Sequence, residues 1–311
     1  MIICTTKNLK LNTTVISIGK FDCFHKGHQE ILKEAASLKN DDMMQVIFTF
    51  DKNPADYAKN HVSGRIFSSE ERRNLVMGFD ADYYIEYPFD DMIKNMRSEE
   101  FVKNILVDKL GMKVIVSGDD FRFGKNREGD VETLKRLGEK YGYDVSVVNS
   151  VFYKGRKISS SLIRDELEKG NLDDVNAMLG RTFYMEDIVR SGAHIGRSMG
   201  LPTINFHVPS DKLLPPMGVY ITKTCIDGIE YESITNIGTR PTFYDNGEKF
   251  VETYIFDFNR DVYKKSAKVL FYKFMRPERK FESTNALCDE IDKNIEEAKN
   301  YFKASAISAD K

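Results

Sequence analysis

The chain has 311 residues, of which 41% are hydrophobic and 30% are charged, and its formal net charge is -2. This length exceeds one ordinary hydrophobic core and predicts two domains in a globular protein. The near balance of 46 basic and 48 acidic residues gives no sign of a nucleic-acid-binding surface. No apolar run approaches the roughly 18 residues of a membrane span, and the N-terminus lacks a signal-peptide pattern.

The four cysteines are scattered, with no CxxC pair and no Cys/His spacing typical of zinc. Scattered cysteines in a chain of this size fit a reducing compartment. We therefore expect a cytoplasmic protein without a zinc site, a membrane span or a nucleic-acid partner. Weak self-association is left open.

Strand and helix patterns alternate through the first half of the chain. Short apolar, β-branched runs predict buried strands at residues 14–19, 45–50, 83–87, 113–118 and 144–148. Between them, apolar residues at helical spacing predict helices, with faces at Ile31, Leu32, Ala35 and Leu38 and at Phe101, Val102, Ile105 and Leu106. Ser68, followed three residues on by Glu71, predicts a capping box. The alternation predicts a parallel sheet covered on both faces.

The composition changes near Gly180. Residues 159–180 predict two short helices that break at Gly170-Asn171, and the segments from there to residue 276 are short and β-rich. Asp227-Gly228, between two such runs, is a hairpin signal, so this half predicts an antiparallel barrel or sandwich. Apolar residues at helical spacing over 287–302 predict a last helix. We place the domains at residues 1–182 and 183–311.

The loop after the first long strand holds Gly19, Asp22, His25, Gly27 and His28. In open parallel sheets, ligands bind beyond the carboxyl ends of the strands. Glycines let the backbone approach a phosphate, and a helix N-terminus offers it free N–H groups. Two imidazoles there can donate to the same phosphates. The alternative is a pair of surface histidines at the start of a helix.

Residues 25–28, "HKGH", match the HxGH signature of the nucleotidyltransferase superfamily, whereas GxxxxGK[ST] and GxGxxG are absent from the sequence. That superfamily has a second signature late in the domain, with Ser or Thr and Arg at the start of a helix. "ISSSLIR", residues 158–164, stands in this place. An ordinary serine N-cap is the alternative for this segment, but the two motifs together favour nucleotide chemistry.

Further segments occur in the order found in one family. In the first half these are "GKFDCFHKGHQ", "TFDKNPADY", "SGDDFRFGKNREGD" and "ISSSLIR". In the second half they are "GRSMGLPTINF", "LPPMGVY", "NIGTRPTF", "VETYIFDF" and "FMRPERKFES". The chain resembles the prokaryotic bifunctional riboflavin kinase/FMN adenylyltransferases, or FAD synthetases, over nearly its whole length.

The resemblance implies a Rossmann-like α/β nucleotidyltransferase domain followed by a small antiparallel Greek-key β-barrel with a C-terminal helix. It implies that ATP phosphorylates riboflavin to FMN in the second domain, with Mg²⁺. It implies that FMN then receives AMP from a second ATP in the first domain, giving FAD and pyrophosphate. Two alternatives are a monofunctional FAD synthetase with a weak or lost kinase site, and a flavin-sensing binding protein.

In the first domain, the resemblance implies that His25 and His28 contact the ATP phosphates and that Ser160, Ser161 and Arg164 close the other side. His28 and Arg164 are the expected catalytic residues there. The loop after Gly118 is implied to form the FMN side, although its aromatics are also consistent with a core role and Asp120 with loop stabilisation. The remaining expected ligand-binding residues are Gly19, Phe21, Asp22, Gly118, Asp120, Phe121 and Phe123.

In the second domain, the resemblance implies that Glu252 is the general base for the riboflavin hydroxyl, since a neutral alcohol benefits from one. A solvent-facing strand residue is the alternative. Thr203 and Asn205 are the implied Mg²⁺ ligands, because Mg²⁺ prefers hard oxygen donors. The implied phosphate and flavin contacts are Gly196, Arg197, Pro202 and Arg276.

The chain departs from the family pattern at several positions. Asp187 and Tyr254 stand where Gly and His are usual in the kinase module, and Ala193 and Ile195 make its nucleotide loop more apolar. These departures leave the strength of the kinase open, while the implied base and Mg²⁺ ligands are retained. In the first domain, Lys20 stands where a small or polar residue is common and Cys23 where Gly is frequent, and neither replacement removes an implied phosphate contact.

Overall fold

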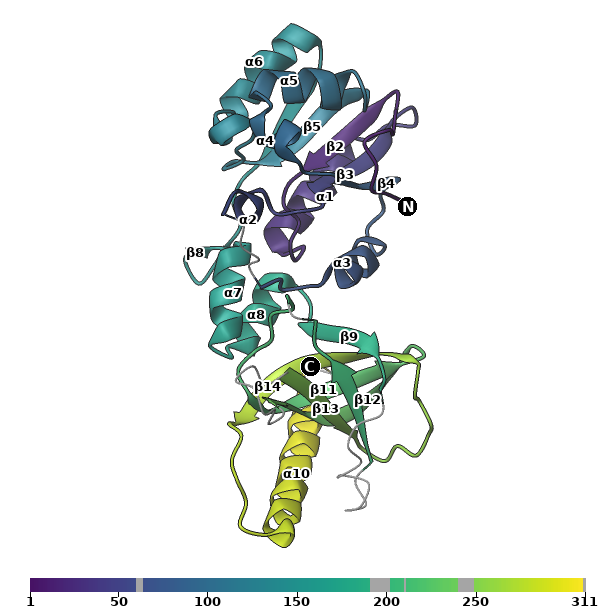
Figure 1. The fold of residues 1–311 in the computed structure, drawn as a ribbon, viewed down its shortest axis with the longest axis vertical. Helices are drawn as coiled ribbons and strands as arrows, with labels where there is room; N and C mark the ends of the chain where they lie inside the picture. The colour runs from purple at the N-terminus through teal and green to yellow at the C-terminus, as the bar shows by residue number, and fades with distance from the viewer. Residues whose placement is uncertain (60–63, 191–201, 210, 240–248, 310–311) are drawn as a thin grey trace. The chain divides into compact units, whose positions relative to one another are not determined.

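The computed structural model describes residues 1–59, 64–190, 202–209, 211–239 and 249–309. The chain forms two compact units, Met1–Leu162 and Ile163–Lys311 (Figure 1). Helix α7 (Ser160–Glu168) contains the point of division. No helix in the described part of the chain is long and apolar enough to cross a membrane.

The first unit is built on a six-stranded sheet in the order β1-β4-β3-β2-β5-β6, and all its strand pairs are parallel. Five strands confirm the prediction, whereas β1 was not predicted because three residues are too few to show a periodic pattern. The strands are β1 (Ile2–Cys4), β2 (Thr14–Ile18), β3 (Met44–Phe50), β4 (Tyr83–Tyr87), β5 (Met112–Gly118) and β6 (Asp144–Val148).

Helices cover both faces of this sheet (Figure 1). Successive strand residues point to opposite faces, so Val15 packs in one core with α1 and Ile16 in the other with α5 and α6. The helical segments are α1 (Lys26–Leu38), α2 (Pro54–Lys59), α3 (Ser69–Val76), α4 (Asp91–Asn95), α5 (Ser98–Phe101), η1 (Val102–Val107), η2 (Lys125–Arg127) and α6 (Val131–Tyr141). The expectation that Leu38 joins the buried face of α1 is wrong, because this last helical residue is 38% exposed.

The predicted capping box at the start of α3 is confirmed. Ser68 Oγ accepts the backbone N–H of Glu71 at 3.2 Å, and Glu71 Oε2 accepts that of Ser68 at 2.6 Å. Two N–H groups that the helix itself cannot satisfy are thereby paired, as a capping box requires.

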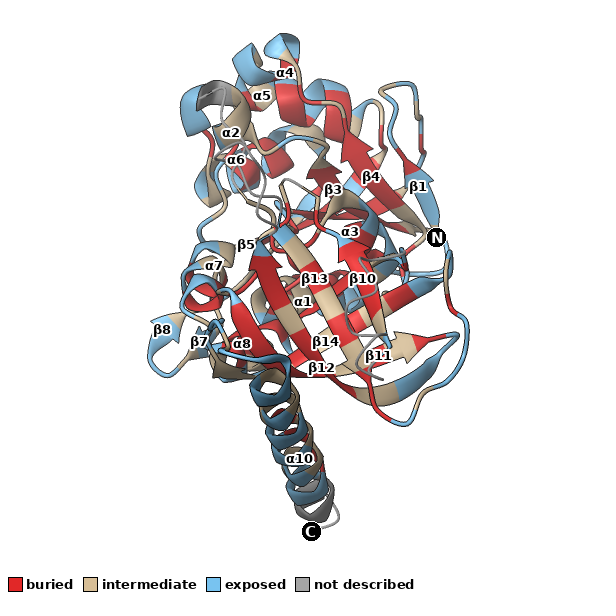
Figure 2. Ribbon diagram, turned by 60° about the horizontal axis from the view of Figure 1, so that its bottom comes forward, coloured by how far each residue is buried: buried red, intermediate tan, exposed pale blue. Residues whose placement is uncertain are grey.

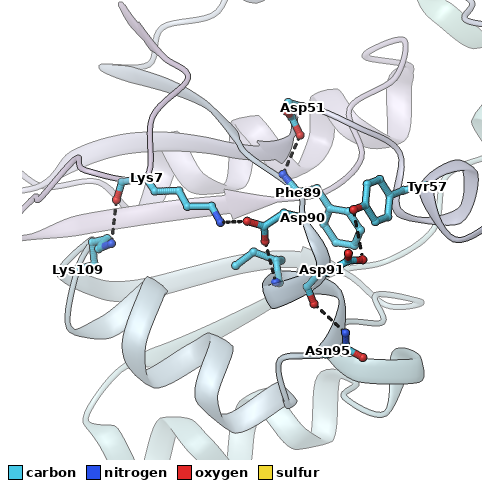
Figure 3. Close-up of polar contacts among 9 residues, drawn as sticks. Lys7, Asp51, Tyr57, Phe89, Asp90, Asp91, Asn95 and Lys109 are labelled. Carbon is cyan, nitrogen blue, oxygen red and sulfur yellow. Dashed lines mark hydrogen bonds and ion pairs between the residues drawn. The ribbon is translucent and has the colours of Figure 1, made fainter.

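Charged side chains tie together the loops at the carboxyl edge of the sheet (Figure 3). Asp51, which follows β3, accepts the backbone N–H of Phe89, which follows β4, at 2.8 Å. Asp90 caps α4 through Ile93 N–H at 3.1 Å and pairs with Lys7 Nζ at 2.5 Å. These contacts fix the loops after two neighbouring strands to each other and to the N-terminal segment.

The second unit contains a six-stranded antiparallel sheet in the order β10-β13-β12-β11-β14-β9. Its first and last strands approach each other, because Arg190 N–H donates to the carbonyl of Asn205 at 2.9 Å, so the sheet nearly closes into a barrel. The elements are α8 (Leu172–Leu179), β9 (Tyr184–Ile188), β10 (Thr203–His207), β11 (Gly218–Ile226), β12 (Ile229–Thr239), β13 (Lys249–Ile255) and β14 (Ser266–Arg276).

The predicted hairpin turn and last helix are both confirmed. Asp227 and Gly228, between β11 and β12, have φ values of 54° and 81°, as a type I′ turn requires. Helix α10 (Thr284–Ala309) packs Ala298 and Phe302 against Ile221 on the outer face of the sheet. In Figure 2, most other residues of α10 are exposed, whereas the strands of this sheet are largely buried or intermediate.

Candidate active sites

The topology of the first sheet places a switch point beside β2. The chain passes from β2 to β3 and β4 in one direction and then returns to β5 and β6 in the other. Ligands of open α/β sheets bind at the carboxyl ends of the strands that flank such a point. Gly19 follows β2 and Gly118 ends β5, so the two predicted loops leave the same edge of the sheet from neighbouring strands.

The two histidines form one stacked pair at the N-terminus of α1. Their ring centroids are 3.7 Å apart, with an interplanar angle of 14°. His25 is buried and caps the helix, because its Nδ1 accepts the backbone N–H of His28 at 3.3 Å. Gly27 lies beneath the pair, where a Cβ would come within 3.2 Å of the His25 ring. The pair is therefore an ordered part of the helix start.

Phe21 and Phe24 support this loop from inside. Both are fully buried, and their rings stack at 5.5 Å. Both have positive φ, 43° and 46°, which bulky residues rarely adopt and which the surrounding packing must hold. Gly19 lies against this core, since a Cβ there would be 3.2 Å from the Phe21 ring. Half-buried Asp22 lies between the two aromatics in the chain.

The second signature contacts the loop that carries the first. Cys23 Sγ lies 3.6 Å from Ser160 Oγ, although the two residues are 137 positions apart. Ser159 also caps α7, because its Oγ accepts Leu162 N–H at 3.2 Å, so the N-cap interpretation and the proximity to the histidine loop both hold. Ser161 is exposed, and Arg164 lies one turn further along α7.

The loop after β5 is fastened to a short hairpin of β7 (Phe152–Tyr153) and β8 (Arg156–Lys157). Lys157 Nζ pairs with Asp120 Oδ2 at 2.7 Å, which supports a loop-stabilising role for Asp120. Asp119 accepts the hydroxyl of Ser150 at 2.6 Å and its N–H at 3.1 Å. The Ser150 hydroxyl, with the Lys157 charge as a smaller contribution, holds the pKa of Asp119 below its ordinary value.

The two aromatics of this loop are placed differently. Phe123 is 8% exposed and belongs to the core that includes Phe101. Phe121 is only partly buried and stacks on Phe123 at 5.4 Å. Phe121 is therefore the one that retains an open surface for a flat ligand.

In the second unit, three strands bring the predicted kinase residues together. Glu252 on β13 stands opposite Asn205 on β10 and opposite Asn236 on β12, so the three side chains share one face of the sheet. Thr203, two residues before Asn205, donates from Oγ1 to Glu252 Oε1 at 2.5 Å. Pro202 is exposed directly before β10, whereas Gly196 and Arg197 lie outside the described residues.

Asn236 is a residue of this face that the sequence analysis did not single out. Its Nδ2 donates to Glu278 Oε1 at 3.0 Å. Glu278 also lies over Gly238, where a Cβ would come within 2.2 Å of the same oxygen. The register opposite Glu252 identifies Asn236, and only the folded sheet supplies that register.

Arg276, at the end of β14, binds α10. Its Nε and Nη2 donate to Asn294 Oδ1 at 3.1 and 3.0 Å, and Nε lies 3.1 Å from Glu290 Oε1. Burial lowers the pKa of this guanidinium. Arg276 therefore joins the sheet to the helix beside the segment that carries Glu278.

Asp187 and Tyr254, which depart from the family pattern of the kinase module, both make structural contacts. Asp187 Oδ2 accepts the backbone N–H of His207 at 3.2 Å and so helps β9 meet β10. Tyr254 packs in the core beneath α10. Neither contact involves the hydrogen bond between Thr203 and Glu252.

The first unit has a parallel sheet with a histidine pair at its switch point, and the second has an antiparallel near-barrel with a Thr–Glu pair. Together these features define a two-domain nucleotide-dependent transferase. Residues 7–162 match the family model of FAD synthetase, and residues 179–302 match that of riboflavin kinase. The chain belongs to the bifunctional riboflavin kinase/FMN adenylyltransferases.

Curated relatives of that description cover nearly the whole chain. The protein of Buchnera aphidicola (subspecies Schizaphis graminum) is 33% identical over 94% of this chain and 96% of its own. That of Bacillus subtilis is 31% identical over 93% and 92%, and that of Escherichia coli K12 is 30% identical over 93% and 92%.

One crystal structure has a similar fold over nearly the whole chain. It is described as a macrolide-efflux protein from Streptococcus pneumoniae, with a TM-score of 0.85, 28% identity, and coverage of 96% of this chain and 99% of its own. We take the fold from this likeness and no activity.

Proposed function

We propose that the chain makes FMN from riboflavin and ATP, and FAD from FMN and a second ATP with release of pyrophosphate. Both family models and the curated relatives support the two activities. The observation that favours two activities over FAD synthesis alone is the Thr203–Glu252 hydrogen bond of 2.5 Å, which joins a hard oxygen ligand to the proposed base. Asp187, the departure that motivated the single-activity alternative, makes a structural contact to His207.

In the adenylyl transfer, the FMN phosphate is an anion and attacks without a base. A bond forms between its oxygen and the α-phosphorus of ATP, and the bond from that phosphorus to the bridging oxygen of pyrophosphate breaks. Catalysis consists of positioning and charge stabilisation. The stacked His25–His28 pair and the N–H groups of α1 hold the ATP phosphates, and Ser160, Ser161 and Arg164 of α7 hold the leaving pyrophosphate.

The FMN side of this site is formed by the loop after β5. Phe121 offers a partly buried ring to the flavin, while Phe123 and the Asp120–Lys157 pair shape the loop. Gly19 and Gly118 keep the strand ends open to the phosphates, and Phe21 and Asp22 shape the histidine loop.

In the phosphoryl transfer, Glu252 accepts the proton of the riboflavin 5′-hydroxyl as that oxygen forms a bond to the γ-phosphorus of ATP, and ADP leaves. Thr203 and Asn205 fit Mg²⁺, because a hydroxyl and an amide oxygen on one face of β10 are hard donors. The metal would neutralise phosphate charge there. Gly196, Arg197 and Pro202 contribute to phosphate binding, and Arg276 acts by holding the segment that carries Glu278.

We propose residues 1–182 and 183–311 as the functional domains of a cytoplasmic protein. The scattered cysteines, which fit a reducing compartment, support this location.

The first experiment follows flavins by chromatography after incubation with ATP and Mg²⁺, with riboflavin in one tube and FMN in another. FMN and FAD from riboflavin, with FAD from FMN, are expected. FAD from FMN alone would mean that the barrel has lost its kinase activity. No product in either tube would favour a flavin-sensing protein.

A further inference from the structure

The interior of the near-barrel contains a continuous chain of buried hydroxyl groups. Its contacts are Thr224–Ser233 at 2.9 Å, Ser233–Thr222 at 2.8 Å, Thr222–Thr235 at 2.8 Å and Thr235–Thr253 at 2.8 Å. All five residues have no exposed surface. Each middle hydroxyl has two partners, and because each carries one proton, rotation of one changes what its neighbours can accept.

Stability alone does not explain why these buried positions carry hydroxyl groups. Burying a hydroxyl costs free energy unless it is hydrogen-bonded, and replacing both members of a buried pair by apolar groups of the same shape can be nearly neutral. Valine has the shape of threonine and would fill these positions. What a hydroxyl chain adds is specificity, because each hydroxyl must meet a particular partner on the neighbouring strand, which favours one alignment of the side chains.

The Thr235–Thr253 end of this hydroxyl chain lies on the opposite face of the sheet from the proposed kinase residues. Thr253 follows Glu252 on β13, and Thr235 precedes Asn236 on β12. Thr235 stands opposite Thr253, and Asn236 stands opposite Glu252. Since successive strand residues point to opposite faces, the hydroxyl pair lies inside the barrel and the Asn–Glu pair on its other face.

Among the described residues, Thr235–Thr253 is the one contact of the hydroxyl chain that reaches β13. The other three contacts join β11 to β12. Backbone pairing joins β13 to β12 along residues 249–255, and the Thr235–Thr253 hydrogen bond adds a side-chain link from β13 to the hydroxyl chain that reaches β11.

We propose that Thr235 and Thr253 are positioning residues for riboflavin phosphorylation. Their hydrogen bond adds to the backbone pairing of β12 and β13 and keeps the Glu252 carboxylate in line with Thr203 and with the hydroxyl that it deprotonates. This inference rests on the proposed function of Glu252 as the base. Small misplacements of a catalytic group are costly, since about 1 Å can lower a rate by about 10²-fold.

The test compares the two ends of the hydroxyl chain, in variants of the full-length protein. Thr253→Val and Thr224→Val each replace a fully buried threonine by its isostere and each remove one hydrogen bond, at 2.8 and 2.9 Å. Thr253→Ser restores the hydroxyl. The kcat and KM for riboflavin, the melting temperature and FAD formation from FMN are measured for each variant.

Thr253→Val is expected to lower kcat for FMN formation by about tenfold or more with KM for riboflavin changed less than about twofold, the pattern of a lost transition-state contact. Thr253→Ser should recover most of that rate, and Thr224→Val should keep it. Equal kcat values in Thr253→Val and Thr224→Val, or a serine variant as slow as the valine variant, would overturn the proposal.

Should Thr253→Val prove too unstable to purify, the double variant Thr235→Val/Thr253→Val replaces the pair without leaving an unpaired hydroxyl between them. Low kcat in this folded variant supports the proposal, and normal kcat overturns it. Glu252→Gln is assayed alongside. An inactive Glu252→Gln with a normal Thr253→Val refutes the positioning alone, whereas an active Glu252→Gln refutes the base and the positioning together.

Discussion

Thr203 and Glu252, which are 49 positions apart in the chain, share a hydrogen bond of 2.5 Å between adjacent antiparallel strands. The bond connects a hydroxyl suited to Mg²⁺ with the carboxylate suited to deprotonate an alcohol. A metal-bound phosphate and an activated hydroxyl must meet within a few ångströms for phosphoryl transfer. The sheet places these two groups side by side.

Replacing Thr203 by valine should lower riboflavin phosphorylation by about 10²-fold, because it removes a polar contact to the reacting groups. Thr203→Ser keeps the oxygen and should retain most of the rate. Initial rates of FMN formation, measured across a range of Mg²⁺ concentrations, check this. Thr239→Val, at the exposed end of β12, is the matched control. An unchanged rate for Thr203→Val would remove Thr203 from the site.

Glu252→Gln should lower FMN formation by about 10²–10⁴-fold, as loss of a general base does. Glutamine has the same shape but accepts no proton at neutral pH. FAD formation from supplied FMN should be unchanged, and chromatography of both reactions tests this. Glu230→Gln, which changes an exposed carboxylate on β12, serves as the control. Normal phosphorylation by Glu252→Gln would show that another group is the base.

His28→Ala should lower FAD formation from FMN by about 10²-fold or more, the cost of one lost transition-state contact. FMN formation from riboflavin should be spared, because the kinase residues belong to the barrel. His207→Ala, which removes an exposed imidazole on β10, is the control for FAD formation. If His28→Ala forms FAD at the normal rate, the stacked pair has no part in adenylyl transfer.

His25 has a separate structural role that mutation can distinguish. His25→Ala removes the side-chain acceptor of His28 N–H and should lower the free energy of unfolding by about 1 kcal/mol, as loss of an N-cap does. His25→Asn keeps an N-capping acceptor and should retain that stability. Both variants should lose adenylyl transfer activity. Urea unfolding and FAD assays of the two variants check this, and equal destabilisation would contradict the capping role.

Acidification should weaken the link between the β5 loop and Ser150. The hydroxyl of Ser150 lowers the pKa of Asp119 in the folded protein, so the contribution of Asp119 to stability is fully present above its unfolded pKa of about 3.9. It is lost as the pH falls through the lower, folded value. Melting temperatures of the native protein and Asp119→Asn should therefore differ at pH 7 and approach each other as the pH falls below about 3.9.

Ser150→Ala is the companion variant for this test, because it removes the hydrogen bond but keeps the carboxylate. Its melting temperature should depend less steeply on pH than that of the native protein. A constant gap between native protein and Asp119→Asn down to pH 3 would contradict the assignment.

The sequence by itself determined the local features, which depend on a few neighbouring residues. Short apolar, β-branched runs predicted five strands of the first sheet, Ser68 and Glu71 predicted a capping box, and Asp227-Gly228 predicted a hairpin. Each of these predictions depends on local periodicity, capping or backbone sterics, which act between residues that are close together in the sequence. The motifs likewise placed His25–His28 and the serines of α7 at helix starts.

Tertiary structure decided what those residues contact. Cys23 meets Ser160 across 137 positions, and Asn236 joins Glu252 only through the register of β12 with β13. Phe123 lies in the core while Phe121 keeps an open face, a choice that identical residue types two positions apart cannot reveal. The buried hydroxyl chain is likewise invisible in a sequence. Register and burial depend on all strands packing at once, because a one-residue slip would turn every side chain to the other face.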